Sequence, residues 1–141
     1  MRIVLGSDER TPLTDAVADD LRSRGHEVVL VGPPGGEEKE WAEVGLDVGR
    51  AVASGDAACG VLFCWTGTGA SIAANKVRGV RAALCTDAAT AAGARRWNDA
   101  NVLVMSLRLT SAELAREMLD AFLAGDVDPA EADNIARLDE P

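Results

Sequence analysis

The most informative segment of this chain reads Gly60-Val61-Leu62-Phe63-Cys64-Trp65-Thr66-Gly67-Thr68-Gly69-Ala70-Ser71. Its first five residues form a continuous apolar run, which is typical of a strand buried on both faces of a sheet. Two closely spaced glycines then mark a tight turn, and the residues after them are expected to form a helix. The segment therefore predicts a strand that passes through a glycine-rich turn directly into a helix.

The rest of the chain repeats this alternation of strand and helix. Four further apolar or β-branched runs predict strands, at residues 2–5, 27–31, 80–85 and 101–105. Helices are expected from Pro12 to a stop at Gly25 and at residues 41–54, 70–76, 87–96 and 110–124. Five strands alternating with five helices predict an α/β fold, a three-layer α/β/α sandwich around a Rossmann-like, five-stranded parallel sheet.

A single domain is expected over residues 1–124, followed by a C-terminal tail at residues 125–141. The tail is polar, acidic and weakly patterned, so we expect it either to fray or to pack on a neighbouring subunit. The helix before the tail has the best-defined start, because Thr110 and Glu113 stand at the spacing of a capping box.

The composition excludes several classes of protein. With 48% hydrophobic residues among 141, the chain can fill one core, and no apolar run approaches the roughly 20 residues that span a bilayer. A formal net charge of -9 and the absence of a basic block argue against nucleic-acid binding. The first residues lead into a turn at residues 6–8 rather than into an apolar leader, so a cytoplasmic location is expected.

The three cysteines, Cys59, Cys64 and Cys85, are odd in number and lack the spacing of a zinc site. We therefore expect free thiols, with neither disulfides nor a metal centre. Cys59 and Cys85 are interpreted as small packing residues. Cys64 differs because it ends a strand just before the glycine turn, where the amides at the start of the next helix favour negative charge.

The turn after Cys64 admits two interpretations. Its spacing alone is compatible with a ligand-free connection, since it lacks both the dinucleotide fingerprint and the lysine of a phosphate-binding loop. The functional interpretation places an oxyanion or carboxylate on its N–H groups, beside the thiol. Cysteine hydrolases need a nearby histidine, and the only one, His26, precedes the second predicted strand. Proton transfer next to a carbonyl, with amides stabilising an enediolate, fits these residues better than acyl transfer.

Six motifs extend this interpretation. They are Gly6-Ser7-Asp8, residues 51–55, residues 60–69, Ser71-Ile72-Ala73-Ala74-Asn75-Lys76-Val77, residues 80–85 and Asn98-Asp99-Ala100-Asn101-Val102-Leu103. Over nearly the whole chain up to about residue 124, they resemble the ribose-5-phosphate isomerase B family, which includes the galactose-6-phosphate isomerase subunits. The resemblance implies a five-stranded sheet between helices, a homodimer or dimer of dimers with active sites at the subunit interface, and interconversion of aldoses and ketoses without a cofactor.

The resemblance also implies roles for individual residues. Cys64 is the base that moves a proton between C1 and C2 of the sugar, and Thr66 assists it. Asp8 contacts sugar hydroxyls, and Asn98 lies beside the substrate. The enediolate oxygen is held by the amides of the turn and of the next helix, Gly67, Thr68, Gly69 and Ala70.

The chain departs from the family's pattern at positions that face the substrate. Glu9 stands where the family has a histidine that meets substrate, and Trp97 replaces a second histidine implicated in opening the sugar ring. Trp65 replaces the glycine after the cysteine, and the two tryptophans either stack on a sugar or fill an interface. An aromatic near Ala89 is missing, and an Arg-His pair in the tail aligns with Asp133-Asn134. Of the basic set that binds phosphate, only Arg108 and Arg137 remain.

These departures predict a changed substrate. Glu9 places negative charge where the family neutralises it, and like charges a few ångströms apart oppose each other by about 1 to 4 kcal/mol in a partly shielded cleft. The indole N–H of Trp97 only donates, so it cannot relay a ring-opening proton as imidazole does.

We therefore predict an aldose–ketose isomerase of the sugar-phosphate isomerase type whose carbohydrate or sugar-phosphate substrate differs from ribose 5-phosphate. A non-phosphorylated, cationic or open-chain derivative suits Glu9 and Asp133, although Arg108 and Arg137 remain available to a phosphate. One alternative is a dimeric sugar-binding or scaffold relative without turnover. Another is a lyase or epimerase that uses the same enediolate.

Overall fold

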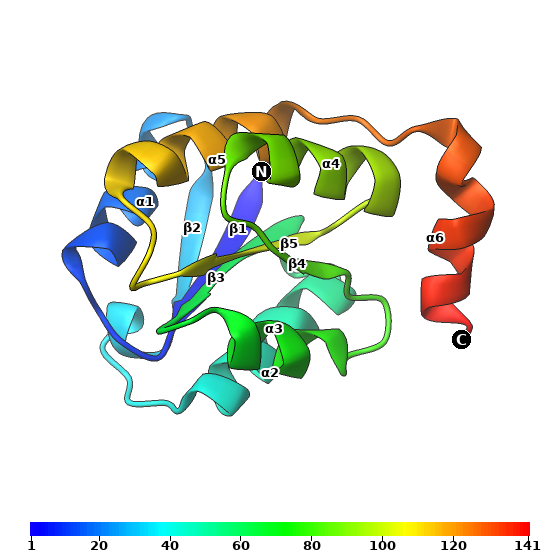
Figure 1. Ribbon diagram of the computed structural model, residues 1–141. Helices are drawn as coiled ribbons and strands as arrows, with labels where there is room; N and C mark the ends of the chain where they lie inside the picture. The colour runs from blue at the N-terminus through cyan, green and yellow to red at the C-terminus, as the bar shows by residue number, and fades with distance from the viewer.

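The computed structural model describes all 141 residues as an alternation of strands and helices (Figure 1). The strands are β1 (Arg2–Ser7), β2 (Glu27–Val31), β3 (Cys59–Cys64), β4 (Ala82–Leu84) and β5 (Val102–Ser106). The helices are α1 (Pro12–Ser23), α2 (Trp41–Ala53), α3 (Thr68–Asn75), α4 (Ala88–Asn98), α5 (Ala112–Ala124) and α6 (Ala132–Asp139). Two short 3-10 turns occupy Pro33–Gly35 and Pro129–Glu131.

The five strands form one parallel sheet in the order β2-β1-β3-β5-β4. Helices α1, α4 and α5 cover one face, and α2 and α3 cover the other (Figure 1). The predicted three-layer α/β/α sandwich is therefore confirmed. The order of strands reverses between β1 and β3, because the chain leaves β1 outward to β2 and returns to β3 on the other side.

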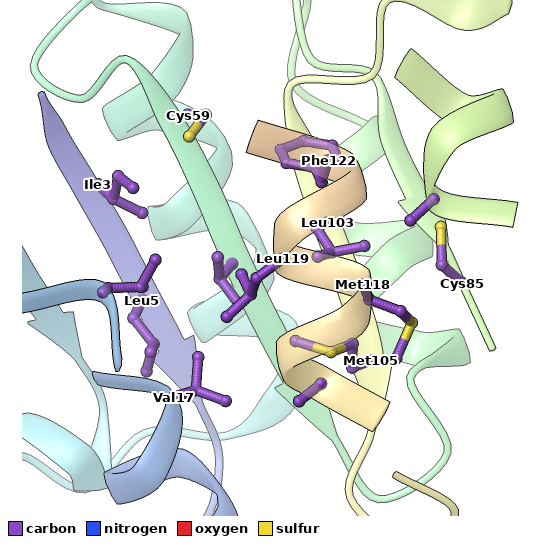
Figure 2. Close-up of a cluster of buried hydrophobic side chains, with 14 of the residues drawn as sticks. Ile3, Leu5, Val17, Cys59, Cys85, Leu103, Met105, Met118, Leu119 and Phe122 are labelled. Atoms are coloured by element: carbon purple, nitrogen blue, oxygen red, sulfur yellow. The ribbon is translucent and has the colours of Figure 1, made fainter. Parts of the chain in front are cut away.

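The sheet separates two apolar clusters. Along β3, Val61 and Phe63 belong to the cluster under α1, α4 and α5, whereas Leu62 and Cys64 belong to the cluster under α2 and α3. This follows from the period of two along a strand, which sends successive side chains to opposite faces. Figure 2 shows side chains of α5, including Met118, Leu119 and Phe122, gathered over the strands in the first cluster. Both faces of β3 are thus buried, as its unbroken apolar run predicts.

The edge strand β4 is shorter than predicted, covering 82–84 instead of 80–85. The Asn75 side chain donates from Nδ2 to the carbonyl of Ala82 at 2.9 Å and accepts the Ala82 N–H at 2.8 Å. The Arg81 N–H is taken at 2.7 Å by Oδ1 of Asn101. Side-chain amides therefore satisfy backbone groups that a longer strand or a further neighbour would have paired.

The start of α5 corrects a prediction. Ser111, not Thr110, is the N-cap, since its hydroxyl accepts the Leu114 N–H at 3.1 Å. The Thr110 N–H instead donates to the carbonyl of Ser106 at 3.2 Å, in the turn that follows β5. This turn delays the helix by one residue, so the predicted capping box between Thr110 and Glu113 does not form.

The tail is more regular than its pattern indicates, because it contains helix α6. Asp139 lies 3.5 Å from Arg81, and Glu140 pairs with Arg78. Figure 1 places α6 beyond the amino ends of β4 and β5, and none of its residues is buried. The expectation of a frayed tail is therefore wrong for residues 132–139 in the structure of this chain.

None of the helices combines the length and the apolar character needed to cross a bilayer.

The cap of α5 can be tested by a pair of neighbouring substitutions. Ser111→Ala removes the acceptor of the Leu114 N–H and should lower the free energy of unfolding by about 0.5 to 2 kcal/mol. Thr110→Ala should change it by less than about 0.5 kcal/mol, because the Thr110 side chain makes no capping bond. Chemical denaturation at a fixed protein concentration measures both values. Equal losses in the two variants would contradict the assignment of Ser111 as the cap.

Candidate active site

The carboxyl ends of the three central strands meet at one edge of the sheet. Ser7, the last residue of β1, pairs with Phe63, and Cys64 at the end of β3 pairs with Ser106 at the end of β5. In parallel α/β sheets, ligands bind beyond the carboxyl ends of the strands where the strand order reverses. Here that point lies between β1 and β3. The residues just after these strands form the candidate site.

Cys64 ends β3 with its side chain largely buried, and 5% of the residue is exposed. Its Sγ accepts a hydrogen bond from the N–H of Gly67, with a donor–acceptor distance of 3.2 Å. Gly67 has φ +81° and is the N-cap of α3, which has no side-chain cap. A Cβ at Gly67 would lie 2.5 Å from Cδ1 of Leu84, which is the flexible end of that side chain, so it is the backbone angle that requires glycine. The sulfur therefore sits at the positive end of α3, bonded to its N-cap amide.

The four backbone amides that were predicted to hold the enediolate oxygen, at residues 67–70, differ in how free they are to bind a ligand. The Gly67 N–H is used by the sulfur, and Ala70 has no exposed surface. Thr68 and Gly69 are at least partly exposed, and helix geometry leaves the first N–H groups of α3 without intrahelical acceptors. The Thr68 N–H lies 3.5 Å from Oγ1 of Thr66, whereas Gly69 has no side-chain acceptor. Gly69 thus offers the most available amide of the set.

Strand β5 holds the turn in place. Ser106 donates from its hydroxyl to the carbonyl of Trp65 at 2.9 Å, and the Leu107 N–H donates to the carbonyl of Cys64 at 3.0 Å. The Arg108 N–H also donates to the Trp65 carbonyl, at 3.1 Å. These bonds bring Arg108 next to the turn. The side chain of Trp65 is mostly exposed, and Thr66 and Thr68 join their hydroxyls at 2.8 Å.

Carboxylates line the neighbouring end of β1. Burial raises the pKa of Asp8 above its ordinary value against the lowering effect of a hydrogen bond from its own backbone, and the charges of Glu9 and Glu40 raise the pKa further. Oδ1 of Asp8 is buried without any hydrogen-bond partner. The turn itself is held by Ser7, whose hydroxyl donates to the Glu9 carbonyl at 2.6 Å and accepts the Glu9 N–H at 3.2 Å. Oδ1 of Asp8 is therefore free to accept a hydrogen bond from a ligand.

Glu40 was missed by sequence reasoning. It is the residue before α2, and it belongs to none of the motifs that single out this edge of the sheet. Its charge acts on Asp8 because the fold brings the start of α2 to the end of β1. No signal in a single sequence reveals that proximity.

The other predicted site residues lie at the opposite edge of the sheet. Trp97 and Asn98 end α4, ahead of β5, whose first residue Val102 pairs with Gly60 at the amino-terminal end of β3. Both line a cavity of about 500 Å³ along α4, which Cys64 does not line. Arg137 is exposed on α6, beyond the amino ends of the strands (Figure 1). One chain therefore does not bring Trp97, Asn98 or Arg137 to the thiol.

Comparison with known proteins identifies the family. The sequence pattern that defines the proteins described as Ribose/Galactose Isomerase matches residues 3–140. This chain belongs to that family. The resemblance seen in the sequence is thereby confirmed, and the relatives, which are named for different sugar phosphates, support the prediction of an aldose–ketose isomerase with an altered substrate.

Three relatives illustrate the breadth of the family. The galactose-6-phosphate isomerase subunit LacB of Clostridium acetobutylicum is 36% identical over 92% of this chain and 75% of its own length. The D-erythrulose-4-phosphate isomerase of Pectobacterium atrosepticum is 35% identical over 87% of this chain and 82% of its own. The solved structure of ribose-5-phosphate isomerase B from Clostridium thermocellum superposes with a TM-score of 0.93 at 39% identity, covering 99% of this chain and 96% of that chain.

The predictions that did not depend on the family resemblance concern Cys59, Cys85, His26 and metal binding. Burial raises the pKa of both Cys59 and Cys85 to about 11, and both are free and buried, which agrees with a packing role. His26 lies 3.2 Å from the amino group of Met1, near the amino end of the sheet and away from Cys64. No group of three or more His, Cys, Asp and Glu side chains is arranged to hold a metal ion.

Ionised Asp8 should destabilise the folded protein near neutral pH. Because folding raises the pKa of Asp8, its ionised form is destabilising at pH 7, and this penalty disappears as the pH falls towards the ordinary value of 3.8. Asp8→Asn should therefore raise the melting temperature near pH 7 and have little effect near about pH 4. Thermal unfolding at the two pH values measures this.

Asp87 provides the control of opposite sign. Hydrogen bonds from Thr90 lower the pKa of Asp87, so its contribution to stability is present near pH 7 and is lost as the pH falls below 3.8. Asp87→Ala should lower the melting temperature near pH 7, because it also removes the N-cap of α4. A loss of stability in Asp8→Asn near pH 7 would contradict the picture of a carboxylate destabilised by burial, with one oxygen left unpartnered.

Proposed function

We propose that this protein interconverts an aldose and a ketose by moving a proton between C1 and C2, with Cys64 as the base. The observation that carries the proposal is the bond of 3.2 Å from the Gly67 N–H to Sγ of Cys64 at the uncapped start of α3. A thiolate in this position accepts a hydrogen bond and faces the positive end of a helix, and both stabilise negative charge. Family membership supports the same chemistry.

The reaction needs no redox partner. The thiolate of Cys64 removes the proton from the carbon next to the carbonyl, and the electron pair of that C–H bond forms the double bond of an enediolate. The carbonyl oxygen becomes negative and is stabilised by the amides of Gly69 and Thr68, which lie in the first turn of α3. The thiol then returns a proton to the neighbouring carbon, while the hydroxyl proton shifts between the two oxygens, a transfer that the Thr66 hydroxyl is suited to relay.

The end of β1 selects the rest of the substrate. Asp8 holds a buried, unpartnered oxygen, so it is suited to accept a hydrogen bond from a sugar hydroxyl. Glu9 and Glu40 add negative charge beside it, and this opposes an anionic group at the same place by about 1 to 4 kcal/mol. We infer a substrate other than ribose 5-phosphate, with hydroxyl or ammonium donors facing Asp8. A phosphate, where present, would have to reach Arg108 or Arg137.

A second copy of the chain completes the site in this proposal. Trp97, Asn98 and Arg137 lie at the opposite edge from Cys64, so within one chain they cannot contact the same small molecule. A symmetric dimer can bring one copy's α4 end and α6 to the other copy's Cys64. The 55% exposed Trp97 and the 60% exposed Trp65 suit such an interface.

Three unpaired thiols also suit the reducing cytoplasm.

A binding protein without turnover is the second candidate. It is favoured by Trp97, whose indole cannot exchange a ring-opening proton as the family's histidine does. This candidate retains the dimer and the sugar but predicts no proton exchange with solvent.

Incubation with aldoses and ketoses, phosphorylated and not, in heavy water separates the two candidates. The wild-type protein should introduce deuterium at C1 or C2 of its substrate, and Cys64→Ala should reduce the rate by at least about 100-fold because the base is lost. Cys59→Ala removes a buried thiol at the opposite end of β3, away from these residues, and should retain the rate. Binding of a sugar without any deuterium uptake would identify the non-catalytic alternative.

Complementation tests the shared site. Cys64→Ala and Asn98→Ala should each be inactive alone, yet a refolded equal mixture should recover about a quarter of the wild-type activity. The reason is that half of the dimers are mixed, and one of the two sites in each mixed dimer is intact. An inactive mixture that contains mixed dimers by mass spectrometry would mean that both residues act within one chain.

A further inference from the structure

Helices α2 and α3 approach each other through small residues. A Cβ on Gly45 would lie 2.7 Å from the carbonyl oxygen of Ala70 and 2.8 Å from Cβ of Ala73. A Cβ on Gly49, one turn later, would lie 3.1 Å from the carbonyl oxygen of Ala74 and 3.0 Å from Cγ2 of Val77, which follows α3. The two backbones are therefore in direct contact along this seam, and the position of α3 depends on α2.

Trp41 stands at the head of the same seam. It is the first residue of α2, and the spacing 41, 45, 49 places it on the helix face that carries the two glycines. A Cβ on Gly69 would lie 2.8 Å from Cε3 and 2.9 Å from Cζ3 of Trp41. The six-membered part of the indole thus rests directly on the backbone of Gly69, the second residue of α3.

This contact falls on the part of α3 that has the least support of its own. The helix lacks a side-chain cap, and its N-cap is a glycine, so its first turn is not held by the usual hydrogen bonds. Trp41 remains 46% exposed, although a tryptophan that served only to fill the core would be expected to be more buried. The ring lies against the side of Gly69 from which a side chain would project.

We propose that Trp41 is a positioning residue, which holds the Gly69 amide where the enediolate oxygen develops. This inference rests on the proposed function, since it assigns the Gly69 N–H as the main donor to that oxygen. A preorganised donor in a shielded position contributes more to catalysis than a mobile one, and a displacement of about 1 Å can cost about 100-fold in rate. Trp41 would act through the backbone of Gly69 and not by contact with the sugar.

The test compares the two ends of the seam. Trp41→Ala removes the ring from Gly69, and Trp41→Phe keeps an aromatic ring there. Val77→Ala loosens the seam at Gly49, away from the amide of Gly69. For each variant we would measure kcat and KM for the sugar identified by deuterium uptake, the melting temperature, and the hydrogen exchange of the Gly69 amide by NMR.

Trp41→Ala should lower kcat by about 10- to 100-fold with KM changed less than about 3-fold, and should speed Gly69 exchange by about 10-fold. Trp41→Phe should recover most of kcat. Val77→Ala should lower the melting temperature while kcat and Gly69 exchange stay near wild type. The proposal is overturned if Trp41→Ala leaves kcat and Gly69 exchange unchanged, or if Val77→Ala lowers kcat equally.

Failure of the proposed function has a different signature. A wild-type protein that takes up no deuterium into any sugar refutes the isomerase while the Gly69 exchange of the Trp41 variants is still measurable. In that case unchanged Gly69 exchange in Trp41→Ala overturns the positioning role as well. Faster exchange supports the claim that Trp41 holds the Gly69 amide in place.

Discussion

The position of one sulfur atom depends on a turn of three residues. Strand β3 ends at Cys64 and α3 begins at Thr68, so the chain must change from extended to helical within residues 65–67. Gly67 makes this possible by adopting φ +81° in a space where a side chain would collide with Leu84. Hydrogen bonds from β5 to the carbonyls of Cys64 and Trp65 then fix the turn to the sheet. The thiol and the turn at residues 65–67 consequently form one unit that is fixed to the end of the sheet.

The two sides of this unit carry opposite electrostatic character. The start of α3 presents N–H groups and the positive end of a helix dipole, whereas the end of β1 presents Asp8 beside Glu9 and Glu40. A molecule that bridges them needs an oxygen that becomes negative at one end and hydrogen-bond donors at the other. A sugar in its open-chain form has both, because its carbonyl lies next to a row of hydroxyls. The proposed function uses both features, with the unsatisfied Oδ1 of Asp8 accepting from a hydroxyl and the uncapped helix facing the oxygen that becomes negative.

The parallel sheet explains why two of the candidate residues, Trp97 and Asn98, lie away from Cys64. Helix α4 runs back from the carboxyl end of β4, so the residues that end it, Trp97 and Asn98, necessarily arrive at the amino edge. Asp99 ends the same helix with φ 47° and binds both Arg81 and Arg95, which anchors that edge. The proposed pairing of two copies follows from this topology, because Trp97 and Asn98 end at the opposite side of the sheet from Cys64.

The sequence by itself determined the layers of the fold, the strand that carries Cys64 and the interpretation of Cys59 and Cys85 as packing residues. These features depend on local periodicity, on turn residues and on the apolar content of single segments, all of which are visible along the chain. The exact start of α5 could not be predicted from the sequence. The cap is Ser111 and not Thr110, because the turn after β5 uses the Thr110 N–H. The helical tail was likewise missed, because its amphipathic pattern is short and half polar.

Only the tertiary structure decided which of the candidate residues meet. It brought Glu40 to Asp8 and the ring of Trp41 to Gly69, and it separated Asn98 and Arg137 from Cys64. Sequence patterns describe what a segment prefers, whereas these contacts depend on where α2 crosses the sheet and on which edge each helix ends. Such distances follow from packing over the whole chain, and no local pattern contains them.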